Sequence, residues 1–108
     1  MMKLWIDDIR EMPEDFDVWA KTANEALNIL KSGKVTHVSF DHDLGDVMDG
    51  DATGYDVAKW VEEQAYHGKI DPFTYAVHSA NTVGASKIRV AMWNAERFWN
   101  KHAEENKN

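Results

Sequence analysis

The chain has 108 residues, a formal net charge of −7 and no cysteine. This length suits one domain with one core, so we expect a single domain over residues 1–108, with residues 104–108 frayed. The lack of cysteine excludes disulfides, thiolate nucleophiles and zinc–thiolate sites. Because no apolar run is long enough for a membrane span or a signal peptide, we expect a cytoplasmic protein that does not contact membranes.

Apolar periodicity predicts strands and helices in the order β, β, α, β, α, β, α. The expected strands are Lys3–Asp7, Phe16–Lys21, Val35–Phe40 and Phe73–Val77. The expected helices begin after Thr22, near Tyr55 and near Val83, and they end at Gly33, at Gly68 and at about Ala103. Between the first two strands, the segment Ile9–Asp15 is too short for a full crossover helix and contains Pro13.

Strands separated by single helices favour parallel pairing through right-handed crossovers. The order that fits is 2-1-3-4, with helices on both faces of the sheet. Strands one and three would then be adjacent, with their carboxyl ends at the same edge. Ligands of open α/β sheets bind in the crevice beyond those ends.

Pairs of acidic residues end the first and third strands: Asp7 and Asp8, then Asp41 and Asp43. Crowded carboxylates raise one another's pKa unless a cation compensates. Mg²⁺ takes oxygen ligands and keeps several waters, so we expect these four acids to hold Mg²⁺ or Mn²⁺. The alternative is structural, with Asp7 capping a turn and Asp43 capping the following loop.

The loop from Asp41 to Gly54 is long for a compact domain, which favours a functional loop. We interpret Asp46, Asp49 and Asp51 within it as solvated charges. The acidic balance and the lack of a basic stripe argue against a broad surface for duplex nucleic acid. A small phosphorylated ligand held through a metal remains compatible with this charge.

The segment His78–Asn81 leads the fourth strand into the last helix. Backbone N–H groups at the helix start, together with Ser79 and Asn81, would form an anion site. Gly84 would let a ligand approach the backbone closely. Capping of the helix by Asn81 or Thr82 is the alternative interpretation.

Two histidines, His42 and His78, follow strand ends and are candidates for general base and general acid. A structural hydrogen-bonding role is the alternative for each. Arg10 follows the first acidic pair by two residues, and it could clamp a phosphate or pair with an acid.

Asp7-Asp8, Asp41 and Ser79-Ala80 resemble the acidic and hydroxyl positions of the receiver domains of bacterial response regulators. The chain departs from that pattern at two points. The first crossover helix is reduced, and the fifth strand with its phosphotransfer lysine is absent. Lys87 lies inside the last helix and does not match that lysine.

The chain is more similar to a compact subfamily, the cyclic-phosphate-processing receiver-like domains. The shared motifs are Asp7-Asp8-Ile9-Arg10-Glu11-Met12-Pro13, Asp41-His42-Asp43-Leu44-Gly45, Thr53-Gly54-Tyr55-Asp56 and His78-Ser79-Ala80-Asn81-Thr82-Val83-Gly84. The resemblance implies an α/β fold, a reduced flavodoxin-like three-layer form of the receiver domain. It also implies a role in handling cyclic phosphate ends of RNA or cyclic nucleotides.

Three functions follow as hypotheses. The first is a metal-dependent phosphoesterase that opens a cyclic phosphate, with Asp41, His42 and His78 as catalytic residues. The second is a phospho-acceptor signalling domain in which Asp41 is the acceptor. The third is a non-catalytic module that binds a nucleotide or a partner protein. His42, which receivers generally lack, favours hydrolysis over phosphorelay.

Overall fold

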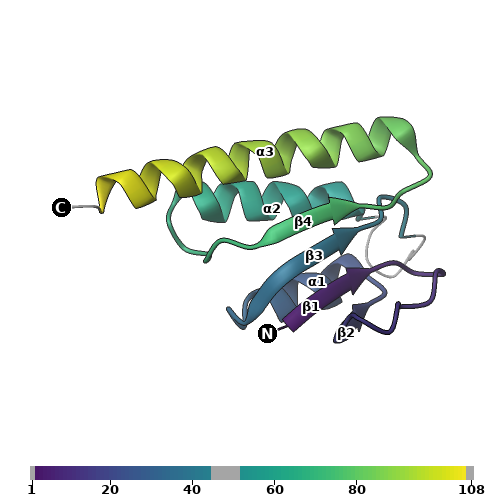
Figure 1. Ribbon diagram of the computed structural model, residues 1–108. Coiled ribbons are helices and arrows are strands. Elements are labelled where there is room, and N and C mark those ends of the chain that lie inside the picture. Colours follow the sequence, from purple (N-terminus) through teal and green to yellow (C-terminus); the bar gives the residue numbers. More distant parts are fainter. Residues whose placement is uncertain (1, 45–51, 107–108) are drawn as a thin grey trace.

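The computed structural model describes residues 2–44 and 52–106. Its elements are β1 (Met2–Ile6), β2 (Val18–Ala20), α1 (Ala23–Leu30), β3 (Val35–Phe40), α2 (Gly54–Tyr66), β4 (Thr74–Val77) and α3 (Thr82–Glu105), as Figure 1 shows. The predicted order of elements is confirmed. The last helix runs two residues past the predicted Ala103. Residues 45–51, with Asp46, Asp49 and Asp51 of the predicted acidic loop, lie outside the described residues.

The four strands form one parallel sheet in the order β2-β1-β3-β4, as predicted. Trp5 of β1 is in register with Ser39 of β3, which is in register with Ala76 of β4. Across residues 2–44 and 52–106 there is no fifth strand, and no helix joins β1 to β2. The carboxyl ends of β1, β3 and β4 therefore meet at one edge of the sheet.

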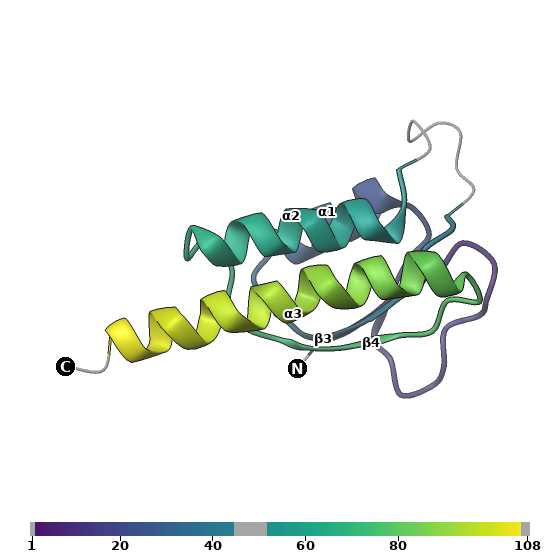
Figure 2. The ribbon, with the colours of Figure 1, turned by 90° about the horizontal axis from the view of Figure 1, so that it is seen from above.

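The three described helices lie on the same side of the sheet (Figures 1 and 2). This differs from the expected placement on both faces. The crossovers from β2 to β3 and from β3 to β4 both advance toward β4. Two right-handed crossovers that advance in the same direction place their helices on the same face. The described part of the chain thus has two layers rather than the three that the resemblance implied, and the β1–β2 connection occupies the side without helices.

Strand alternation separates two sets of side chains. Leu4, Ile6, Val38 and Phe40 are fully buried in the core cluster that also contains residues of α1, α2 and α3. Trp5 points to the opposite face, where its ring meets the Phe16 ring edge-on, with 5.2 Å between centroids. A single aromatic from the β1–β2 connection thus helps to cover the face on which no helix packs.

Helix α2 begins with a capping box. Thr53 accepts a hydrogen bond from the backbone N–H of Asp56, whose carboxylate accepts one from the N–H of Thr53.

Loss of such a cap costs about 1 kcal/mol, so Thr53→Ala should lower the unfolding free energy by that amount in urea titrations. Thr82→Ala, at an exposed first position of α3, is the matched control and should change it by less than about 0.5 kcal/mol. Equal losses in the two variants would contradict this cap assignment.

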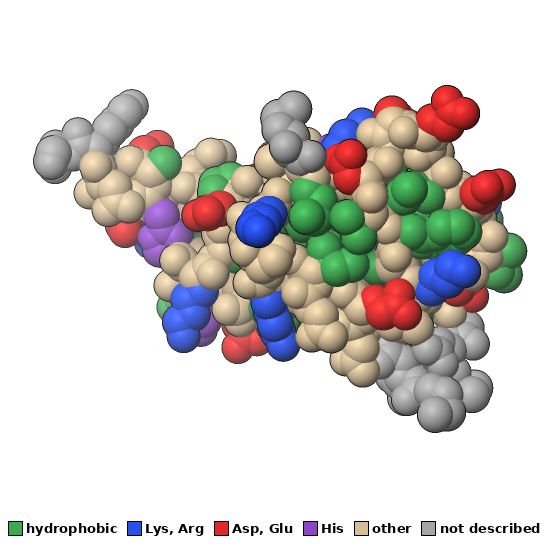
Figure 3. Space-filling view, turned by 90° about the horizontal axis from the view of Figure 1, so that it is seen from below, with side chains coloured by type: hydrophobic (Ala, Val, Ile, Leu, Met, Phe, Trp, Pro, Cys, Tyr) green, Lys and Arg blue, Asp and Glu red, His purple; other side chains and the backbone are tan. Residues whose placement is uncertain are grey.

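The underside of the molecule, where β2 forms one edge of the sheet, is seen in Figure 3. Hydrophobic side chains come to this surface in groups bordered by single acidic and basic side chains. The edge strand β2 has only three residues, and a short edge limits pairing with other chains. Among the described helices, none is long and apolar enough to cross a membrane.

Candidate functional site

Three carboxylates gather beyond the ends of β1 and β3. Asp7, Asp8 and Asp41 each offer an oxygen, and these oxygens lie within 4.8 Å of one another. They line a pocket of about 260 Å³ to which Arg10, Asp43 and Ser79 also contribute. Three of the four predicted ligand acids are therefore brought together, at the sheet edge where the sequence places them.

Asp7 is the buried member of this cluster, with 3% of its surface exposed. Its Oδ1 accepts hydrogen bonds from the backbone N–H groups of Ile9 (2.8 Å) and Arg10 (2.7 Å). Its Oδ2 lies 2.9 Å from Nε2 of His78. Asp7 thus closes the turn after β1, the structural role that the sequence allows, and it also belongs to the carboxylate cluster.

The pKa of Asp41 is raised above its usual value, first by burial and then by the negative charge of Asp7. Hydrogen bonds from Ser79 and from the backbone N–H of His42 (2.9 Å) act in the opposite direction. The raised pKa of Asp41 means that the site disfavours a further negative charge. A bound cation would relieve that repulsion.

Asp43 has other partners. Its Oδ1 lies 2.8 Å from Nδ1 of His42, and both its oxygens lie 3.4 Å from Nδ2 of Asn81. The hydrogen bond with His42 is the main cause that lowers the pKa of Asp43. Asp43 reaches the pocket rim but lies outside the three-carboxylate cluster.

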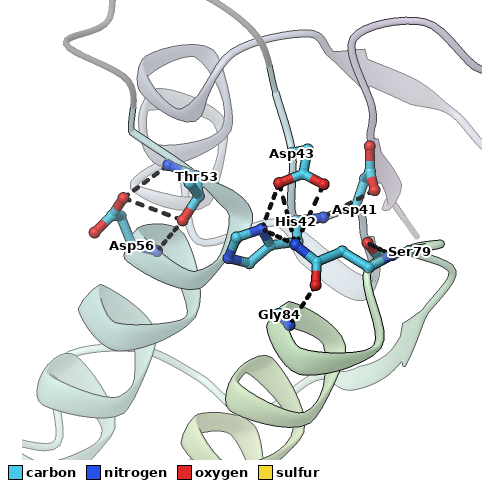
Figure 4. Close-up of polar contacts among 8 residues, drawn as sticks. Asp41, His42, Asp43, Thr53, Asp56, Ser79 and Gly84 are labelled. Atoms are coloured by element: carbon cyan, nitrogen blue, oxygen red, sulfur yellow. Dashed lines mark hydrogen bonds and ion pairs between the residues drawn. The ribbon is translucent and has the colours of Figure 1, made fainter.

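His42 does not line the acidic pocket. Figure 4 shows its ring directed away from Asp41, toward the first turns of α2 and α3. A Cβ on Gly84 would overlap the His42 ring, so glycine at this position makes room for the imidazole. The space expected to admit a ligand at Gly84 is filled by a side chain of the protein.

Asn81 caps α3. Its side-chain oxygen accepts a hydrogen bond of 2.9 Å from the backbone N–H of Gly84. This is the capping role that the sequence allows beside anion binding. Ser79 precedes it in the same connection, and its hydroxyl accepts a hydrogen bond of 3.1 Å from the N–H of Asn81. Ser79 also lines the acidic pocket, whereas Asn81 does not, so of the two only Ser79 is in reach of a ligand there.

Arg10 is exposed and reaches across the pocket. Its Nη1 donates a hydrogen bond of 2.8 Å to the carbonyl oxygen of His78, which ties the β1–β2 connection to the end of β4. A guanidinium carries five N–H donors, so this contact leaves donors for an anion. Arg10 brings a positive charge to a pocket whose other charged lining residues are acids.

The cluster fits a hard divalent cation. All three candidate ligands are carboxylates, the donors that Mg²⁺ and Mn²⁺ prefer. Because Asp7 is buried and repulsion from it raises the pKa of Asp41, a positive charge at this site would be favourable. Asp7, Asp8 and Asp41 would hold the ion, with its remaining positions left for water or a phosphate oxygen.

Two residues beside the site, Trp5 and Ser39, belong to none of the sequence motifs. Trp5 stacks on His78 with 3.9 Å between ring centroids, and Ser39 lies 2.7 Å from Nδ1 of the same ring. Both precede a site acid by two positions, which places them on the same face of their strands. The alternation of side chains along each strand is the sequence signal that could have placed Trp5 and Ser39 beside the site.

The geometry defines a reduced receiver-like α/β fold with an acidic pocket at the carboxyl edge of its sheet. The model of the cyclic-phosphate processing receiver domain family matches residues 2–94, and the chain belongs to that family. Comparisons with curated proteins and with solved structures found no match. The resemblance drawn from the four motifs is therefore confirmed.

Proposed function

We propose that this domain is a metal-dependent phosphoesterase that opens cyclic phosphates of RNA ends or nucleotides. The observation that carries the proposal is the cluster of Asp7, Asp8 and Asp41, whose oxygens lie within 4.8 Å of one another. Family membership supports a role in cyclic-phosphate processing. The pocket of about 260 Å³ is slightly smaller than typical small-molecule sites, and it has room for the phosphate end of such a ligand.

A divalent cation bound there would polarise the phosphoryl group and lower the pKa of a water. Arg10 and Ser79, which line the same pocket, would hold phosphate oxygens. Opening the ring adds one water: its oxygen bonds to phosphorus, one ring P–O bond breaks, and the released oxygen takes a proton.

Of the three predicted catalytic residues, Asp41, His42 and His78, Asp41 is the one that lines the pocket. One carboxylate oxygen of Asp41 would hold the ion, and the other would accept the proton of the attacking water. The released oxygen takes its proton from solvent, because Arg10 and Asp43 at the pocket rim are exposed. His42 and His78 then act by holding Asp43 and Asp7 rather than by touching the substrate.

The test is turnover of 2′,3′-cyclic AMP by the purified chain with Mg²⁺, Mn²⁺ or Ca²⁺, followed by anion-exchange chromatography of samples quenched with EDTA. We expect the cyclic phosphate signal to convert to that of a phosphomonoester in at least one of these ions. No conversion in any of them would rule out hydrolysis of this substrate.

One observation favours a second candidate, a non-catalytic binder. Neither His42 nor His78 lines the pocket, so the two histidines predicted to transfer protons are not among the residues that surround a phosphate held there. Recovery of unchanged 2′,3′-cyclic AMP from a stable complex would select this function over hydrolysis.

A further inference from the structure

A series of side chains runs behind the acidic pocket, from Asp7 through His78 to Ser39. Nε2 of His78 lies 2.9 Å from Oδ2 of Asp7, and Nδ1 lies 2.7 Å from the Ser39 hydroxyl. The ring is stacked on Trp5 with an angle of 4° between the two planes. Both nitrogens and one face of the imidazole are thus held by protein groups.

An Asp–His–Ser series can activate the serine as a nucleophile, but burial argues against that role here. Ser39 is 3% exposed, and it does not line the acidic pocket. A substrate phosphate in the pocket therefore has no access to the Ser39 hydroxyl. The end of the series that can influence a ligand is therefore Asp7, which lines the pocket.

The contacts of Asp7 show what His78 controls. A carboxylate offers about four lone-pair positions. Oδ1 uses two of them for the N–H groups of Ile9 and Arg10, and Oδ2 uses one for Nε2 of His78. One position is left, on Oδ2, and the contact with His78 sets its direction.

We infer that His78 is a positioning residue that fixes Oδ2 of Asp7 for a divalent cation, an inference that rests on the cation site of the proposed function. Ionised Asp7 can only accept a hydrogen bond, so the neutral ring carries its proton on Nε2. Nδ1 then accepts the hydrogen of the Ser39 hydroxyl. Outer partners of this kind change metal affinity by about 10- to 100-fold.

Two variants separate positioning from folding. The amide nitrogen of His78→Gln can take the place of Nε2 and keep the contact with Asp7, whereas that of His78→Asn matches Nδ1 and keeps only the contact with Ser39. Both lose the stack on Trp5, and His78→Asn also loses a hydrogen bond to the buried Asp7, so thermal melting without metal should show both variants folded and His78→Gln the more stable. Isothermal titration with Mn²⁺ should show wild-type affinity within about 3-fold for His78→Gln and affinity at least about 10-fold weaker for His78→Asn.

Equal Mn²⁺ affinities in the two variants, or tighter binding by His78→Asn, would overturn the positioning role while leaving the cation site intact. If the wild-type protein does not bind Mn²⁺, the cation site and the positioning role fail together. Long-range ¹H–¹⁵N spectra of the wild-type protein give a readout that needs no variant. They should show the proton of the neutral His78 ring on Nε2, and a proton on Nδ1 instead would contradict the inference.

Discussion

Replacement of Gly54 by alanine should destabilise the domain by about 3 kcal/mol, near the upper end of overpacking effects. A Cβ at this position would overlap the carbonyl oxygen of Asp41 and lie 2.9 Å from its carbonyl carbon. Those are backbone atoms, so no side-chain rotation can relieve the contact. The N–H of Gly54 also donates a hydrogen bond of 2.9 Å to the carbonyl oxygen of His42. The start of α2 is thus packed directly against the end of β3.

Urea titrations of Gly54→Ala and Gly33→Ala measure this effect. Gly33 has a φ of +76°, and a Cβ added there would meet no described atom within 4 Å, so alanine bears only the left-handed strain of about 1 to 2 kcal/mol. We expect the larger loss at Gly54. A smaller loss at Gly54 than at Gly33 would mean that α2 does not contact the Asp41 backbone this closely.

Asp41→Asn should lower the rate of cyclic-phosphate opening by at least about 100-fold. General acid–base groups contribute about 10²- to 10⁴-fold, and Asn provides neither the charge nor the proton acceptor. Because Asn removes a partly buried charge that repels Asp7, the variant should remain folded. Initial rates at saturating Mn²⁺, from anion-exchange chromatography of samples quenched with EDTA, give the measurement.

The matched control is Asp71→Asn, an exposed acid between α2 and β4, at the opposite end of the sheet. It makes the same chemical change and should keep the rate within about 2-fold. If the rate of Asp41→Asn also stays within about 2-fold of the wild-type rate, Asp41 is not a catalytic residue.

The order of the strands in the sheet could be predicted because the length of each connection limits where the next strand can pair. Short connections and single helices between Lys3 and Val77 left few topologies, and the order 2-1-3-4 is observed. The same reasoning should have placed the helices, since crossovers that advance in one direction share a face. The expected helices on both faces came from the general pattern of α/β folds rather than from this order.

The acids of the site could be predicted because they follow strand ends, and Asp7, Asp8 and Asp41 indeed meet. The side-chain contacts around these acids could not be predicted. Asp43 lies beyond the end of β3, so strand alternation no longer sets its direction. The contact between the His42 ring and Gly84 joins residues 42 apart in sequence, and no local pattern indicates which glycine admits a side chain and which a ligand.

The thermal melting temperature with and without Mn²⁺, for the wild-type protein and Asp8→Asn, tests the three-carboxylate cation site most directly. Mn²⁺ at about 100 times its Kd should stabilise the wild-type fold by about 2.7 kcal/mol and raise its melting temperature by several degrees. Asp8→Asn should lose this shift, and without metal it should melt at the same or a higher temperature, because one of the crowded carboxylates is gone. A wild-type protein that does not respond to Mn²⁺, or an Asp8→Asn variant that responds equally, would contradict the site.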